Sequence, residues 1–237
     1  MYVVVHKTTS KNLSATALHV GGATMQPTSG ARNLGVLFDS HLDLKQHISH
    51  VCRSCYFQLR QLPVVRRSLP PGVLRTLMHS FMSCCLDYCN SLIAGLPLCD
   101  LQRLQSVQNA AARLFGGVSK RGSVVPVHRD DLHWLPIKQR IDFRIGVLSF
   151  KAINGLAPQY LVEMFTPIAA NPALRRNRSA DRGDLIIQTV KNMSYGRRSF
   201  AISGTSFWNS LPVDLRRSSS LTEFKSKLNT HLFGGAY

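Results

Sequence analysis

The pattern of hydrophobic positions changes character near residue 40. Before it, short apolar runs such as Ala17–Val20 and Leu34–Phe38 are separated by glycine and serine, which indicates strands joined by tight turns. After it, apolar residues recur at steps of three and four, the spacing that places side chains on one face of an α-helix. The sequence therefore predicts a short β segment followed by a mainly helical chain.

The first helix is predicted from an apolar face that runs from Leu44 to Leu59. Its polar face carries basic side chains, among them Arg53 and Arg60. We expect the helix to end at Leu62-Pro63, because proline has no backbone N–H to donate to the preceding turn.

Two further helices are predicted before residue 117. One should begin near Pro71 and end at Leu96-Pro97, with apolar residues on one side. In the other, Asp100 is the expected N-cap, and Gly116-Gly117 should stop the helix.

The second half of the chain predicts helices mixed with strands. A helix should run from about Pro136 to Asn154-Gly155, where glycine suits a left-handed C-cap. Leu185–Val190 and Arg198–Ile202 have the apolar composition of strands. The segment from Ser220 to Glu223 is a capping box that should open a last helix.

The charge of the chain bears on its binding partners. The sequence has 29 Lys and Arg residues against 12 Asp and Glu, which gives a net charge of +17. A positive field of this size attracts polyanions, and nucleic acid is the commonest such partner. A basic but inert surface, a membrane surface or an acidic protein are the alternatives. No apolar run is long enough to span a membrane, and the N-terminus is not a secretory signal, so we expect a nuclear or cytoplasmic protein with no membrane partner.

Clustered basic residues are the strongest candidates for a binding site, since arginine forks match the geometry of phosphate oxygens. Tyr195 and Phe200 lie close to one cluster and could stack on unpaired bases. For any single cluster, a solvated charged face is the alternative. The candidate nucleic-acid-binding residues are Arg66, Arg67, Lys120, Arg121, Arg175, Arg176, Arg178, Arg182, Arg197 and Arg198.

No catalytic, metal or cofactor site is predicted. Asp130-Asp131 is the only adjacent acidic pair, and it is flanked by His128 and Arg129 rather than by the apolar residues of a polymerase metal hairpin. We expect the pair to cap a turn or to help start the next helix. The serines and glycines do not form a nucleophile elbow or a phosphate-binding loop.

The cysteines are interpreted as buried free thiols. Cys52-x-x-Cys55 and Cys85-x-x-x-Cys89 have spacings that could be imagined as a zinc site. Both pairs, however, lie inside helical patterns and lack the glycines of a zinc knuckle. The six cysteines are Cys52, Cys55, Cys84, Cys85, Cys89 and Cys99.

Beyond these patterns, several exact strings resemble one protein family. They are LDYCNSLIAGLP, LQRLQSVQNAAARLF and LHWLPIKQRIDF within residues 86–143, with MQPTSGARNLGVLFDSHLDLKQHI before them and FKAINGLAPQYLVEMF and YGRRSFAISGTSFWNSLP after them. This set is similar to the region beyond the polymerase active site in reverse transcriptases of LINE-type, jockey-like non-LTR retrotransposons. The resemblance covers the chain from about residue 20 onward.

The resemblance implies an α+β fold that is predominantly α-helical. Residues 1–40 would be a β-hairpin remnant from the end of the palm, residues 41–117 a helical thumb-like bundle, and residues 127–237 a small mixed α+β C-terminal domain. In this family the thumb grips the template–primer duplex, the C-terminal region helps to engage RNA or DNA, and the catalytic carboxylates lie upstream. The resemblance thus implies a non-catalytic fragment of an RNA-directed DNA polymerase that binds nucleic acid. The alternative is a decayed helical protein with no retained role, or a protein-interaction module.

Overall fold

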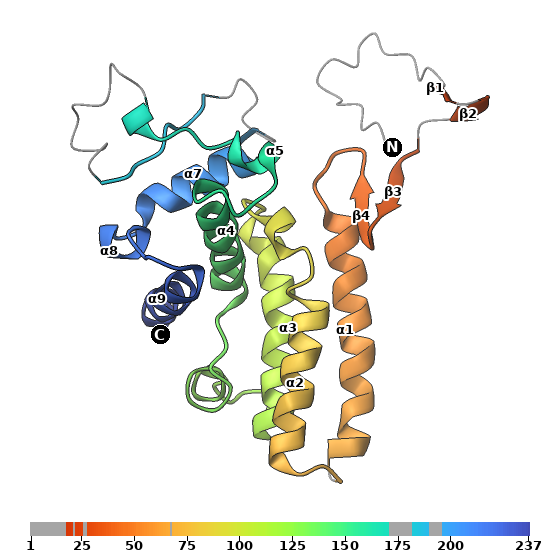
Figure 1. The fold of residues 1–237 in the computed structure, drawn as a ribbon. Helices are drawn as coiled ribbons and strands as arrows, with labels where there is room; N and C mark the ends of the chain where they lie inside the picture. The colour runs from red at the N-terminus through yellow and green to blue at the C-terminus, as the bar shows by residue number, and fades with distance from the viewer. Residues whose placement is uncertain (1–17, 21, 26–27, 67, 171–181, 190–195) are drawn as a thin grey trace.

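The structure is a computed structural model that describes residues 18–20, 22–25, 28–66, 68–170, 182–189 and 196–237. Over these residues the chain is mostly helical, with two small antiparallel β-hairpins near its N-terminal end (Figure 1). The predicted fold class, predominantly α-helical α+β, is confirmed.

The two hairpins are independent of each other. In the first, β1 (Leu18–Val20) pairs with β2 (Ala23–Met25), and in the second β3 (Gly30–Asn33) pairs with β4 (Val36–Asp39). Leu34 and Gly35 connect β3 to β4 with φ values of 45° and 83°. Positive φ at both central residues is typical of the type I′ turn, whose twist matches that of the flanking strands. The strand expected at residues 34–38 therefore begins only after the turn.

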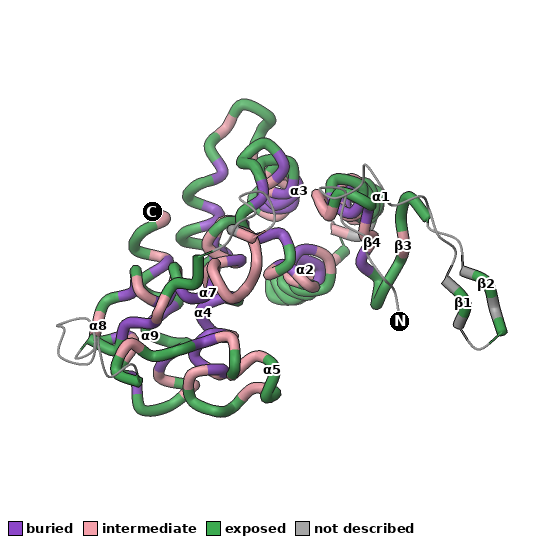
Figure 2. The backbone as a smooth tube through the Cα atoms, turned by 90° about the horizontal axis from the view of Figure 1, so that it is seen from above, coloured by how far each residue is buried: buried purple, intermediate pink, exposed green. Residues whose placement is uncertain are grey.

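Three helices follow and lie side by side, each antiparallel to the one before it, so that the first and the third run in the same direction (Figure 1). They are α1 (Lys45–Arg66), α2 (Pro71–Cys85) and α3 (Leu98–Gly116), with a short 3-10 turn η2 (Asn90–Ile93) between the last two. Their buried faces meet in one hydrophobic core, and much of the outer surface of α1 is exposed (Figure 2). The apolar periodicity of the sequence predicted these faces correctly, since Leu44, Ile48, Cys55 and Leu59 are all buried.

Three of the predicted helix ends are wrong. Helix α1 continues through Pro63 to Arg66, because a proline so close to the C-terminal end removes only one hydrogen bond from the helix. Helix α2 ends at Cys85 rather than near Leu96, and Cys89 then takes a left-handed conformation that starts η2. Asp100 lies in the first turn of α3, whose N-cap is Pro97. The predicted stop at the other end of α3 is confirmed, since Gly117 is a left-handed C-cap with φ of 66°.

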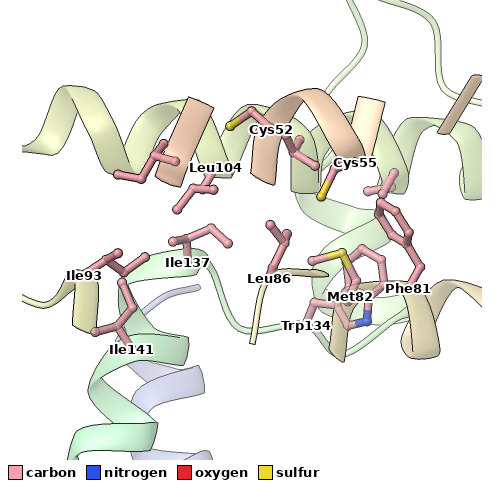
Figure 3. Close-up of a cluster of buried hydrophobic side chains, with 14 of the residues drawn as sticks. Cys52, Cys55, Phe81, Met82, Leu86, Ile93, Leu104, Trp134, Ile137 and Ile141 are labelled. Carbon is pink, nitrogen blue, oxygen red and sulfur yellow. The ribbon is translucent and has the colours of Figure 1, made fainter. Parts of the chain in front are cut away.

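Helix α4 (Ile137–Ile153) is shared between two hydrophobic cores. Its first half contributes Ile137, Ile141 and Ile145 to the core of α1, α2 and α3. Figure 3 shows Ile141 beside Ile93 and close to Ile137 at one end of this core. Its second half packs against the C-terminal helices. The predicted left-handed position after α4 is confirmed at Gly155, with φ of 68°.

The second core is formed by α4 with α7 (Phe200–Ser210), α8 (Val213–Arg216) and α9 (Leu221–Gly234). Stacked and tilted aromatic rings fill its centre, with 4.5 Å between the ring centroids of Phe150 and Phe224 and 5.9 Å between those of Trp208 and Phe224. The short elements α5 (Gln159–Val162), η4 (Ile168–Ala170) and η5 (Gly196–Arg198) lie between α4 and α7 along the chain.

The capping box at the start of α9 is confirmed, whereas both C-terminal strands are wrong. The Glu223 N–H donates to Ser220 Oγ at 3.2 Å, and Glu223 Oε2 accepts from the Ser219 N–H at 2.9 Å. Leu185 makes only an isolated β-bridge with Pro167, and residues 186–189 form no strand, while Val190 is outside the described residues. Residues 198–202 belong to η5 and α7, because Phe200 turns inward against the core and contacts Phe165 edge to face at 5.2 Å.

Candidate nucleic-acid interface

A groove lies between the C-terminal halves of α1 and α3, with a volume of about 480 Å³. We call it the arginine groove. Helix α1 supplies Tyr56, Leu59, Arg60, Pro63 and Arg66, helix α3 supplies Ala110, Arg113 and Leu114, and the following turn supplies Gly117 and Val118.

Helical spacing explains why these side chains share one groove. Residues three, four and seven positions apart lie on the same side of a helix, which places Tyr56, Arg60 and Pro63 together on α1. The same rule places Ala110, Arg113 and Leu114 together on α3. Since α1 and α3 pack against each other, the two faces border one depression.

Arg66 spans the ends of the two helices. Its Nη2 donates to the carbonyl oxygen of Phe115 at 3.4 Å. A cation near the last carbonyls of a helix is stabilised by their partial negative charge. Gly117 has a positive φ, which favours glycine, and a Cβ added there would lie 3.1 Å from Arg66 Nη2.

The positive charge of the groove is not neutralised by its own lining. Among the described lining residues none has a carboxylate, and none of the ion pairs found in the described part of the chain includes Arg60, Arg66 or Arg113. The Nε–H of Arg113 is shielded from solvent and lacks a hydrogen-bond acceptor. Buried donors are normally paired, so this group is an exception.

Besides burial, the positive charge of Arg113 lowers the pKa of a neighbouring histidine, His128. Burial, together with the positive charges of Arg113 and Arg140, lowers the pKa of His128 to about 4. This imidazole is therefore neutral at physiological pH and does not add to the charge of the groove.

The structure brings some of the sequence candidates to this groove and places others elsewhere. Arg66 lines it, and Lys120 and Arg121 are exposed in the turn that follows Val118. Arg67, Arg175, Arg176 and Arg178 lie outside the described residues, and so does the side chain of Arg197.

Two other candidates are held by contacts within the protein. Arg198 donates to the carbonyl oxygen of Leu42 at 2.8 Å and passes close to Gly95. Arg182 pairs with Asp184, with 2.9 Å between Nη2 and Oδ2. Phe200, expected to be free for stacking, is packed between the two cores.

Asp184 anchors a buried ion pair with Arg216, whose side chain is only 5% exposed. Burial raises the pKa of Asp184, but the hydrogen bonds and positive charges of Arg216 and Arg182 outweigh it and leave the pKa lowered. Arg216 therefore has a structural role, although it belongs to a basic pair in the sequence.

The acidic pair at residues 130–131 is not a helix cap. Asp130 pairs with the adjacent Arg129 at 2.7 Å, and both side chains are exposed in a turn of π-helix (Val127–Asp131). Helix α4 begins after Pro136 without a side-chain cap, so the predicted capping role is wrong. Over the described residues, no three His, Cys, Asp or Glu side chains come together as metal ligands.

The cysteines are only partly buried. Cys52 and Cys55 lie in the core, whereas Cys84 and Cys99 are exposed, so the prediction that all six are buried is wrong. The Cys55 thiol of α1 hydrogen-bonds with Cys85 at the end of α2. This hydrogen bond raises the pKa of Cys55 and lowers that of Cys85 to about 7.

The sequence did not single out Tyr56 or Arg113 as site residues, and it treated Arg60 only as part of the polar face of a helix. Arg113 is isolated along the chain, so it has no clustering signal. Only the pairing of α1 with α3 brings it to Arg60 and Arg66.

Comparison with known proteins gives no relative: no protein-family model, no curated protein and no solved structure matches this chain. Within the described part of the chain, none of the helices has the length and apolar character to cross a membrane.

Proposed function

We propose that this chain is a non-catalytic protein that binds RNA or DNA through the phosphate backbone, with the arginine groove as its main site. The observation that carries the proposal is the grouping of Arg60, Arg66 and Arg113 in one groove whose described lining has no carboxylate. Guanidinium groups that lack an ion-pair partner are free to bind phosphate oxygens in a bidentate manner.

The surrounding charge favours a polyanion over a small anion. Lys120 and Arg121 extend the basic surface beyond the groove, and the whole chain has a net charge of +17. A nucleic acid can contact several of these groups at once and release a counterion at each phosphate. Phosphate contacts position a protein without reading bases, so the binding is nonspecific for sequence.

The sequence strings support a proposal for the origin of the chain. Their similarity to LINE-type reverse transcriptases favours a C-terminal part of an RNA-directed DNA polymerase, with a palm-end hairpin at residues 1–40, a thumb at 41–117 and a C-terminal domain at 127–237. The order of hairpin and three-helix bundle agrees with that assignment. In this proposal the polymerase carboxylates belong to the palm and not to this chain.

A salt series tests the binding. If about five basic side chains displace counterions, the logarithm of the affinity for a labelled duplex or RNA–DNA hybrid should fall with the logarithm of salt concentration at a slope of about −4 to −5. Fluorescence anisotropy over the series measures the slope. Absence of binding at low salt, or binding that does not change with salt, would contradict the proposal.

A further inference from the structure

The arginine groove is lined by two chemically different kinds of side chain. Arg60, Arg66 and Arg113 supply positive charge, while the lining between them is largely apolar, as at Pro63 and Leu114. Tyr56 completes the groove with an aromatic ring that is 38% exposed. A ligand that fits both kinds of surface has an anionic part joined to a flat apolar part.

The volume of the groove, about 480 Å³, is within the range of roughly 300–1,000 Å³ that is usual for sites holding one small molecule. A duplex presents only phosphates and sugars to such a groove, because its bases are stacked inside. It would therefore reach the arginines but leave the apolar lining in contact with water. An unpaired nucleotide can place its phosphate and its base in the groove together.

We propose that the arginine groove holds an unpaired nucleotide of single-stranded nucleic acid, with its phosphate on the arginines and its base against Tyr56 and the apolar lining. This inference rests on the proposed function and names the form of nucleic acid that the site selects. No ion pair among the described residues includes Arg60, Arg66 or Arg113, so a phosphate does not have to displace a carboxylate.

The test compares three labelled probes at one salt concentration by fluorescence anisotropy. They are a single strand of mixed sequence, the same sequence as a duplex, and an abasic strand that has the phosphates but no bases. Stacking of one base on an aromatic side chain changes affinity by about 5- to 150-fold. The full-length chain should therefore bind the single strand more tightly than either other probe by a factor in that range.

Two variants and one matched control locate the effect. Tyr56→Ala removes the ring and should abolish the preference, so that the single strand and the abasic strand bind with the same affinity. Ala110→Leu narrows the apolar lining without a change of charge, and should also reduce the preference for the single strand over the abasic strand. Phe57→Ala is the control, because Phe57 is the next residue of α1, is 64% exposed and does not line the groove.

Each outcome is decisive. A preference for the single strand that is lost in Tyr56→Ala and kept in Phe57→Ala supports the inference. Equal binding of the single strand, the duplex and the abasic strand overturns it but leaves the proposed function intact, since phosphate contacts alone then account for binding. If none of the three probes binds, the proposed function itself fails.

Discussion

At the scale of single residues, His128 is the group whose environment has the clearest consequence for stability. It is 4% exposed, its Nε2 lies 3.0 Å from Asn109 Oδ1, and its ring contacts Trp134. Arg113 of α3 and Arg140 of α4 are the charged groups that oppose its protonation, after burial itself, which is the largest cause of its low pKa.

The pKa of His128 predicts that the protein is less stable in acid. It is about 4 in the folded protein against 6.5 for an ordinary histidine. Below an ordinary histidine pKa, the unfolded chain binds a proton that the folded protein does not, so the free energy of unfolding falls as the pH falls. This single group should remove roughly 2 kcal/mol between about pH 7 and pH 5. Urea unfolding of the wild type and of His128→Gln at both pH values measures the difference, and an equal fall in both proteins would contradict it.

Cys85 should react with alkylating reagents at a lower pH than the other cysteines. The hydrogen bond from Cys55 lowers its pKa to about 7, whereas an ordinary thiol has a pKa of about 8.5. Its rate of reaction with iodoacetamide, followed by mass spectrometry, should therefore rise through about pH 7. Cys55→Ala removes the donor and should move this rise to higher pH. An unchanged profile in that variant would show that the thiol pair has no such effect.

At the scale of elements, α4 joins the two cores through a close contact at Gly146. A Cβ at this position would lie 2.8 Å from both Leu228 of α9 and Phe207 of α7. We expect Gly146→Ala to lower the free energy of unfolding by about 1–3 kcal/mol, because both neighbours are packed and must move.

The matched control is Gly234→Ala at the end of α9, where an added Cβ meets no atom within 4 Å. Alanine lowers the backbone entropy of the unfolded chain, so this change should be neutral or slightly stabilising. Chemical unfolding of both variants separates overpacking from a general effect of replacing glycine. Equal stability of the two would contradict the close contact.

The elements also show what the sequence could and could not predict. The buried faces of α1, α3 and α9 followed from apolar spacing, because a helix orients its side chains by local geometry alone. The extension of α1 beyond Pro63 was not predicted, because the sequence shows the proline but not that it lies in the last turn, where it removes only one hydrogen bond from the helix. The apolar residues around Phe200 predicted a strand. The structure has helix α7 there, and Phe200 contacts Phe165, which is distant in the sequence.

The arginine groove was predictable only in part for the same reason. Arg66 was a candidate because it is next to Arg67 in the sequence. Lys120 and Arg121 were candidates because they form a second adjacent basic pair. Arg113 and Tyr56 become site residues only when α1 and α3 are aligned, and no local pattern encodes that alignment.

At the scale of the whole molecule, we expect no polymerase or nuclease activity with Mg²⁺ or Mn²⁺. The only adjacent carboxylates in the sequence are Asp130 and Asp131, and Asp130 is already paired with Arg129. A primer-extension assay and a nuclease assay on the purified chain check this expectation. Primer extension that is abolished by changing both aspartates to asparagine would contradict it.

The central claim is that the arginine groove, and not the net charge of the molecule, carries nucleic-acid binding. The direct test compares Arg66→Gln/Arg113→Gln with Arg144→Gln/Lys225→Gln, which removes the same number of charges from exposed positions outside the groove. The salt dependence of affinity for one labelled single strand is measured for both proteins. We predict that the slope of the groove variant is flatter by about two, one unit for each lost phosphate contact, and that the slope of the control stays close to that of the wild type. Equal slopes and equal affinities in the two variants would contradict the account.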